Sequence, residues 1–85
     1  MMLKDTAKLM CSEDYKERFV AEYYQTFNRY LGLREMLRKW DSNRLTFEPI
    51  CPRSTYDIQL QAMKQYLSVL EARAVMEHIN LADYE

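Results

Sequence analysis

The sequence predicts an all-α protein whose two long helices pair as an antiparallel hairpin. The chain has one Gly and two Pro among its 85 residues, too few for a fold built from tight turns. Apolar residues recur at spacings of three and four along two long segments, which is the period of a helix with one apolar face. A polar break at 41–43, followed by Pro49 and Pro52, separates the two segments. Two helices joined by a short connector most simply fold back on each other.

The first helix is expected over about residues 12–40. Ser12 is a candidate N-cap, because its hydroxyl can accept a hydrogen bond from a free backbone amide of the first turn. Arg38 and Lys39, near the other end, would lie where the helix dipole favours cations. The apolar positions that share one face of this helix are Tyr15, Phe19, Tyr23, Phe27, Tyr30, Leu33 and Leu37.

The second helix is expected over about residues 54–80. Ser54 is the candidate N-cap, with Asp57 three residues later in the position of a capping box. The apolar pattern fades after His78 and Ile79. The pattern before that point is heptad-like and suits packing against a neighbouring helix at a shallow angle. Its members are Tyr56, Leu60, Met63, Leu67, Leu70 and Ala74.

The chain is predicted to form a single domain over 1–85, because 85 residues are too few for two. A short helical turn is expected before the hairpin, with apolar contacts from Leu3, Leu9 and Met10. So small a domain needs a crosslink, a metal, regular helix packing or a partner subunit. Apolar residues that lie off the two helix faces would be exposed and therefore predict a homo-oligomer. They are Val20, Tyr24, Leu31, Met36, Trp40, Tyr66, Val69 and Met76.

Composition and charge argue against several functional classes. The net charge of −1 disfavours a general binder of DNA or RNA polymers, which needs a basic excess, but it leaves room for a local basic pocket. No apolar run reaches the ~18–20 residues of a membrane span, and the first ten residues do not resemble a signal peptide. A cytoplasmic protein is therefore expected. In that compartment Cys11 and Cys51 are expected as two reduced thiols, with a disulfide as the alternative, and Cys51 as a small buried hydrophobe.

The sequence offers little for catalysis, so the protein is not expected to be an enzyme. His78 is the only histidine, which leaves few parts for a metal site or a Cys–His pair. No catalytic motif is present, and no cofactor or metal is expected.

The sequence contains more residues suited to binding a small ligand. Seven tyrosines could stack on bases, or they could simply fill the core and interfaces. Arginines, which suit bidentate contact with phosphate, gather near the connector at Arg34, Arg38, Arg44 and Arg53. Arg73 stands alone in the second helix. It could bind phosphate, or it could pair with a carboxylate of the facing helix such as Glu17 or Glu22.

Three stretches together carry a resemblance to a known family: Asp14–Leu37, Phe47–Pro52 and Gln59–Glu77. They resemble small phage and prophage helical-hairpin proteins related to the anti-CBASS sponges, with a hairpin that is also found in an anti-Thoeris sponge. The resemblance covers roughly residues 12–80. The shared pattern lies at Arg18, Glu22, Tyr23, Arg38, Lys39, Gln61, Met63, Tyr66, Leu67, Leu70, Glu71 and Arg73.

The resemblance implies a function. Proteins of that family form compact homo-oligomers, typically hexamers, and bind cyclic dinucleotides and, at separate sites, cyclic trinucleotides without cleaving them. Depletion of the second messenger in the host cytoplasm keeps the immune effector inactive. By carry-over, Tyr23 would be a stacking or core tyrosine, and Arg38 and Arg73 would contact phosphates. Arg44 and Arg53, in the connector region, are candidates from their charge alone.

Two other functions stay open on the residues. The exposed apolar flank would equally suit a phage or prophage hairpin that docks another protein and has no nucleotide ligand. An enzyme that acts on nucleotides is the weaker alternative.

Overall fold

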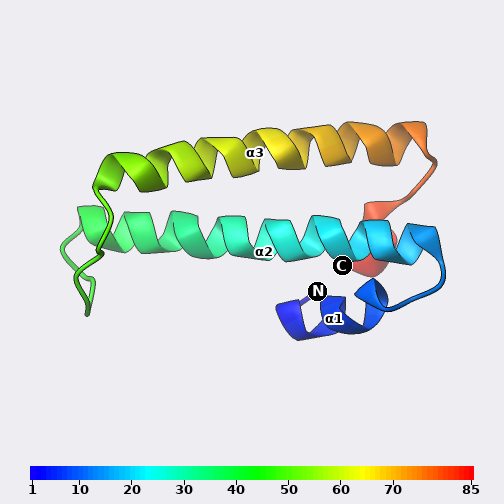
Figure 1. Cartoon of the computed structure of the whole chain (residues 1–85), viewed down its shortest axis with the longest axis horizontal. Helices are drawn as coiled ribbons and strands as arrows, with labels where there is room; N and C mark the ends of the chain where they lie inside the picture. Colours follow the sequence, from blue (N-terminus) through cyan, green and yellow to red (C-terminus); the bar gives the residue numbers. More distant parts are fainter.

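The computed structural model describes all residues 1–85, and its regular secondary structure consists of helices without a strand. The prediction of an all-α fold is confirmed. In Figure 1 the helices α2 and α3 lie side by side and run antiparallel along the long axis, while α1 packs on the other side of α2. The elements are α1 (Leu3–Met10), α2 (Tyr15–Asp41), α3 (Arg53–Met76) and the 3₁₀ helix η1 (Leu81–Tyr84).

Helix α2 begins later than expected, because Asp14 and not Ser12 is its N-cap. The Asp14 carboxylate accepts a 2.9 Å hydrogen bond from the backbone amide of Lys16, and a carboxylate at this end also complements the helix dipole. The Ser12 hydroxyl instead accepts from the Asp14 amide at 3.0 Å and donates to Glu17 at 2.5 Å. Ser12 therefore fixes the turn that precedes the helix.

The start of α3 also differs from expectation. Its N-cap is Pro52, with an extended backbone (ψ 150°) and no side-chain hydrogen bond. The predicted capping box of Ser54 and Asp57 is wrong, because the Asp57 carboxylate accepts a 2.7 Å bond from Arg53. The fixed φ of proline is suited to a position at the edge of a helix.

Helix α3 ends at Met76, and the predicted extension to residue 80 is wrong. His78 adopts a left-handed backbone (φ 58°), and the Ile79 amide donates to the Ala74 carbonyl at 2.8 Å, a common way to end a helix. The reversal buries Ile79, which is 7% exposed. The chain then continues into η1, which lies near the N-terminal end of α2 (Figure 1).

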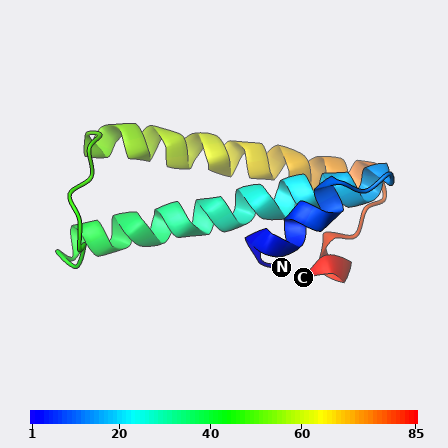
Figure 2. The ribbon, with the colours of Figure 1, turned by 60° about the horizontal axis from the view of Figure 1, so that its bottom comes forward.

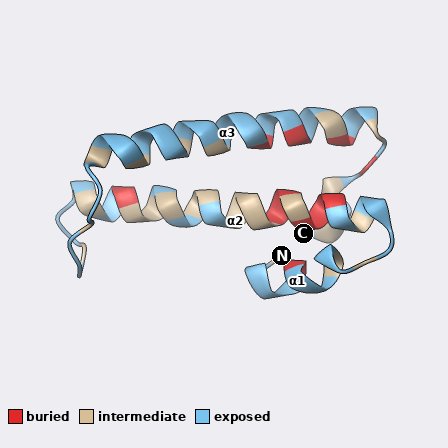
Figure 3. Cartoon of the chain, in the orientation of Figure 1, coloured by how far each residue is buried: buried red, intermediate tan, exposed pale blue.

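The core lies at the end of the hairpin opposite the connector. Figure 3 shows the buried residues concentrated in the first half of α2 and the last half of α3. The Tyr24 hydroxyl donates to the Leu81 carbonyl at 2.7 Å, and Met1, Leu9 and Leu81 pack on the same cluster. The core residues are Phe19, Val20, Tyr23, Tyr24, Leu67, Leu70, Ala74 and Ile79.

Two expectations about apolar contacts need correction. Val20 and Tyr24, expected on an exposed flank, are buried, because the N-terminal segment and the residues after α3 pack over them. In the N-terminal helix α1, only Leu9 of the three expected contacts packs on the core, since Leu3 and Met10 are exposed.

The connector half of the hairpin has almost no core. Leu37 is the one buried residue between positions 25 and 66, and Figure 2 shows α2 and α3 diverging toward the connector.

Both cysteines are free and exposed, so the expectation that Cys51 is buried was wrong. None of the helices combines the length and the apolar run that crossing a membrane demands.

Candidate ligand site at the connector end of the hairpin

The structure separates the five predicted site residues into two groups. Tyr23 and Arg73 lie at the core end, while Arg38, Arg44 and Arg53 lie at the connector end. Because a helix rises about 1.5 Å per residue, Tyr23 and Arg38 are about 22 Å apart along α2. Within one chain the five residues therefore do not come together in one site.

Tyr23 is built into the core. Its side chain is 8% exposed, and its hydroxyl donates a 2.7 Å hydrogen bond to Glu71 of α3. Its ring stacks on Phe27 with centroids 5.8 Å apart and meets Tyr24 edge-on at 5.1 Å. Burial raises the pKa of Tyr23, and the bond to Glu71 raises it further. No face of this ring is open to a base.

Arg73 is already held by neighbouring side chains. Its Nε donates to Glu77 at 3.0 Å and its Nη2 to the Tyr15 hydroxyl at 2.8 Å. The Tyr15 hydroxyl donates in turn to Glu77 at 2.6 Å, and the guanidinium lies 5.0 Å from the centre of the Phe19 ring. The carboxylate partner of Arg73 is thus on its own helix, and not on the facing helix as the alternative of Glu17 or Glu22 required.

At the connector end, a first pocket of about 470 Å³ lies between α2 and α3. Arg53 donates to Asp41 at 3.0 Å and to Asp57 at 2.7 Å, its Nε is buried without a partner, and its guanidinium lies 5.7 Å from the Trp40 ring. The pocket is lined by Arg34, Glu35, Leu37, Arg38, Asp41, Arg53, Asp57 and Leu60. Three arginines thus face three carboxylates, and the first pocket is close to neutral.

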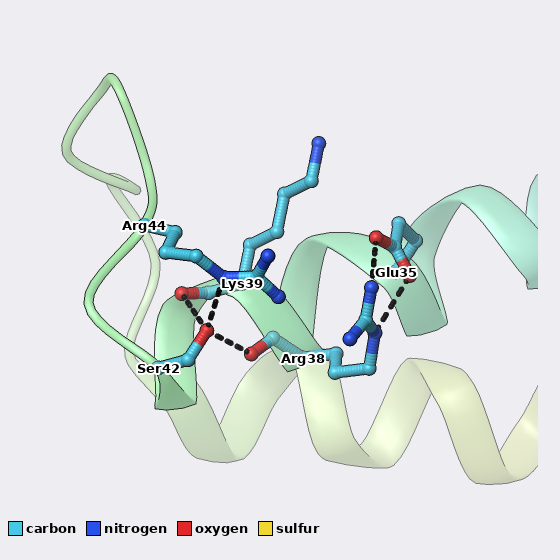
Figure 4. Close-up of polar contacts among 5 residues, drawn as sticks. All are labelled: Glu35, Arg38, Lys39, Ser42 and Arg44. Atoms are coloured by element: carbon cyan, nitrogen blue, oxygen red, sulfur yellow. Dashed lines mark hydrogen bonds and ion pairs between the residues drawn. The ribbon is translucent and has the colours of Figure 1, made fainter.

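A second pocket of about 220 Å³ lies between α2 and the connector, and it carries a net positive charge. Its cations are Lys39, which makes no ion pair or side-chain hydrogen bond, and Arg44, whose Nε donates to Ser42 at 2.8 Å. Figure 4 shows the Lys39 side chain extending away from the helix, with no bond from its amino group to the other four residues drawn. The pocket is lined by Gly32, Glu35, Met36, Lys39, Arg44, Leu45, Thr46 and Phe47.

Two further features make the second pocket a candidate for a flat anionic ligand. Phe47 is 55% exposed, so its ring is accessible for stacking. A Cβ added to Gly32 would meet no atom within 4 Å, so the absence of a side chain there leaves the wall of the pocket open. An aromatic ring beside two cations is the combination that binds a base and a phosphate.

Glu35 lines both pockets and links them electrostatically. Arg38 holds its carboxylate with two bonds, from Nε at 2.9 Å and from Nη2 at 2.6 Å (Figure 4). These hydrogen bonds lower the pKa of Glu35, and the charges of Arg38, Lys39 and Arg44 lower it further. The Glu35 carboxylate thus offsets part of the positive charge at the connector end.

Of the eight residues that line the second pocket, only Arg44 was among the sequence-predicted site residues. The three others that give the pocket its character are Gly32, Lys39 and Phe47. One signal could have indicated Gly32, because a glycine inside a helix costs about 1 kcal/mol relative to alanine and so calls for a local reason. Phe47 gave no such signal, since its place beside Arg44 depends on the path of the connector.

No group of His, Cys, Asp or Glu side chains is arranged to hold a metal ion.

A protein-family model described as Sequestin matches residues 13–76, a span that includes both connector-end pockets and all of α3. No curated protein matches the chain, and no solved structure does.

Proposed function

The chain belongs to the Sequestin family, and from this premise we propose that it is a non-catalytic sponge for cyclic oligonucleotide second messengers. In this proposal the protein is a phage anti-defence factor that acts in the host cytoplasm as a homo-oligomer, with a hexamer implied by the resemblance. It captures cyclic di- or trinucleotides and so blocks activation of the host immune effector. The family name is compatible with a sequestering role.

The observation that carries the proposal is the second pocket, where Lys39 and Arg44 lie beside the exposed ring of Phe47. Cyclic oligonucleotides present phosphates and bases in a compact ring. Lysine and arginine neutralise phosphates, and an aromatic face stacks on any base. The open wall at Gly32 gives such a ligand room to approach α2.

Arg38 and Arg53 would contribute by exchanging partners. Arg38 is held by Glu35, and Arg53 by Asp41 and Asp57, in ion pairs whose side chains are between 32% and 64% exposed. Such pairs contribute little to stability, so a phosphate can replace a carboxylate without large loss. Arg73 is the weaker candidate, because Glu77, Tyr15 and Phe19 hold it from three directions.

A titration followed by the fluorescence of Trp40 tests the proposal. Trp40 is the one tryptophan of the chain, and it directly follows Lys39. We expect saturable changes with a cyclic di- or trinucleotide, and mass analysis should return the ligand unchanged. Charge-assisted hydrogen bonds contribute about 1.5–3 kcal/mol each, so the double variant Lys39→Ala/Arg44→Ala should weaken binding about 100-fold or more.

The matched control is Lys4→Ala/Lys8→Ala, which removes two cations from α1, at the far end of the molecule. It should bind as the native protein does. Equal loss in both variants would mean that net charge, and not the pocket, controls affinity. No fluorescence change and no thermal shift at high ligand concentration, where a bound ligand must raise the melting temperature, would overturn the sponge proposal.

The second candidate function is a protein-interaction module with no nucleotide ligand. The observation in its favour is apolar surface that a ligand site does not explain, including Ile50 at 99% exposure in the connector and Ile58 at 71% in α3. Under this hypothesis every cyclic nucleotide leaves the protein unchanged, and the free chain is monomeric until its partner binds.

A further inference from the structure

Helix α3 carries a second apolar stripe, on the face turned away from α2. Three of its members are large and exposed: Ile58 at 71%, Val69 at 55% and Met76 at 69%. The others, also exposed, are small or neutral. We call this stripe the outer seam. Its spacings of four, three, four, three and four are those of a helix that packs along another helix, and its residues are Ile58, Ala62, Gln65, Val69, Ala72 and Met76.

The outer seam lies almost opposite the face that packs on α2. Each of its positions is two residues beyond a position of the inner stripe, as Val69 is beyond Leu67, and two residues turn a helix by about 200°. The outer seam contains no charged residue. Three of the five charges of α3, Arg53, Glu71 and Arg73, bond to side chains of α2. The other two also lie outside the seam, at Asp57 and Lys64. Figure 3 shows the outward side of α3 as exposed along its length. A helix face open to water normally carries charges, so this face lacks its partner.

We propose that the outer seam packs antiparallel against the outer seam of a second copy of this chain. In such a pair Ile58 lies opposite Met76, Ala62 opposite Ala72, and Gln65 opposite Val69. Large residues thus meet large ones and small meet small. Tyr66, which lies beside the outer seam, would face Tyr66 of the second copy. No like charges would face each other. The proposal names the contact for the homo-oligomer of the proposed function and rests on that part of it.

Two observations favour a second copy over another protein. Only 11 of the 85 residues are buried, and the connector half of the hairpin contributes just Leu37, so this small chain needs its apolar face covered whenever it is folded. A second copy of the chain is the one partner that is present wherever the chain is synthesised. The antiparallel direction follows from charge, because a parallel pair would bring the two positive pockets with Lys39 and Arg44 to the same end.

Light scattering on the ligand-free protein, at micromolar concentration, tests the seam. The native chain should form an oligomer with an even number of subunits. Val69→Glu should at least halve the mass, whereas the matched control Lys64→Glu, which also places a glutamate on α3 but beside the seam, should leave it unchanged. A monomeric native chain, or a Val69→Glu variant with native mass, would overturn the proposal.

Crosslinking keeps the proposal testable if Val69→Glu fails to fold. In a background with Cys11→Ser and Cys51→Ser, Ala62→Cys chains mixed with Ala72→Cys chains should form a disulfide-linked pair. Ala62→Cys chains alone should not, and their crosslinking to each other would overturn the antiparallel direction. Because no ligand is added, failure of the seam leaves nucleotide binding intact as a separate result, and failure of nucleotide binding leaves the measured oligomer unaffected.

Discussion

Tyr23 and Glu71 join the two long helices, because the Tyr23 hydroxyl of α2 donates a 2.7 Å hydrogen bond to the Glu71 carboxylate of α3. The ring behind that hydroxyl is 8% exposed and stacks on Phe27. The bond therefore joins the core to the surface and fixes how the helices pair. It also gives Tyr23 a structural role at a position where the family resemblance allowed either stacking or packing.

Substitution of Tyr23 should affect stability and leave the ligand site intact. Tyr23→Phe removes one hydrogen bond and should lower the free energy of unfolding by about 1 kcal/mol, while Tyr23→Ala should lower it by about 3–5 kcal/mol, as for other buried aromatics. Urea unfolding measures both. Nucleotide affinity of Tyr23→Phe should equal that of the native chain, and a tenfold loss of affinity in a fully stable variant would restore Tyr23 as a ligand contact.

The two helix starts give a matched comparison. Asp14→Ala removes a side chain that accepts from the Lys16 amide and should destabilise the protein by about 1 kcal/mol. Ser54→Ala removes a hydroxyl that caps nothing, since Pro52 is the N-cap of α3, and should change stability by less than about 0.5 kcal/mol. Equal effects of the two substitutions in thermal unfolding would contradict the assignment of the caps.

Periodicity in the sequence located the two long helices, because apolar spacing reports which residues face a neighbour. Periodicity could not locate the end of α3. The helix ends at a left-handed backbone at His78, and only a glycine at that position would have indicated such a backbone in the sequence. Periodicity also misplaced Val20 and Tyr24, which segments distant in the sequence bury. Arginine positions indicated the connector end as a candidate site. They could not show that Arg53 pairs with Asp41, because the two residues lie on different sides of the connector and only the folded chain brings them near.

Glu35 should act as an internal competitor for an anionic ligand. The Glu35 carboxylate pairs with Arg38 at 2.6 Å, and it also interacts with the charges of Lys39 and Arg44. Glu35→Gln removes this negative charge, so the protein should bind phosphate several-fold more tightly. A nucleotide titration at low salt gives the largest effect, because ions screen these exposed charges. Glu13→Gln, which removes one negative charge just before α2, is the control. Unchanged or weaker binding by Glu35→Gln would place the phosphates elsewhere.

Glu77 should make stability depend on acid. Hydrogen bonds from Tyr15 and then Arg73 lower its pKa below the ordinary value of 4.5. A carboxylate with a lowered pKa in the folded state contributes stability that is full above its unfolded pKa and is lost as pH falls through the folded value. Between pH 7 and 5 stability should therefore not respond to this group, and below about 4.5 it should fall. Urea unfolding of Glu77→Gln across this range should show a shallower fall than the native chain, and an identical pH profile would contradict the role of the Tyr15–Arg73–Glu77 cluster.

Gly32 offers a test in which stability and binding should move in opposite directions. Its missing side chain weakens α2, and a Cβ there meets no atom within 4 Å, so Gly32→Ala should raise the free energy of unfolding by about 0.5–1 kcal/mol. Gly32→Leu should stabilise the helix to a similar extent, because leucine is also a strong helix former. Its longer side chain would fill the pocket beside Phe47 and should weaken nucleotide binding far more than alanine does. Thermal unfolding and Trp40 fluorescence measure the two effects on the same samples. Native affinity in a stabilised Gly32→Leu protein would show that the ligand does not enter this pocket, since the two variants differ only in the bulk placed there.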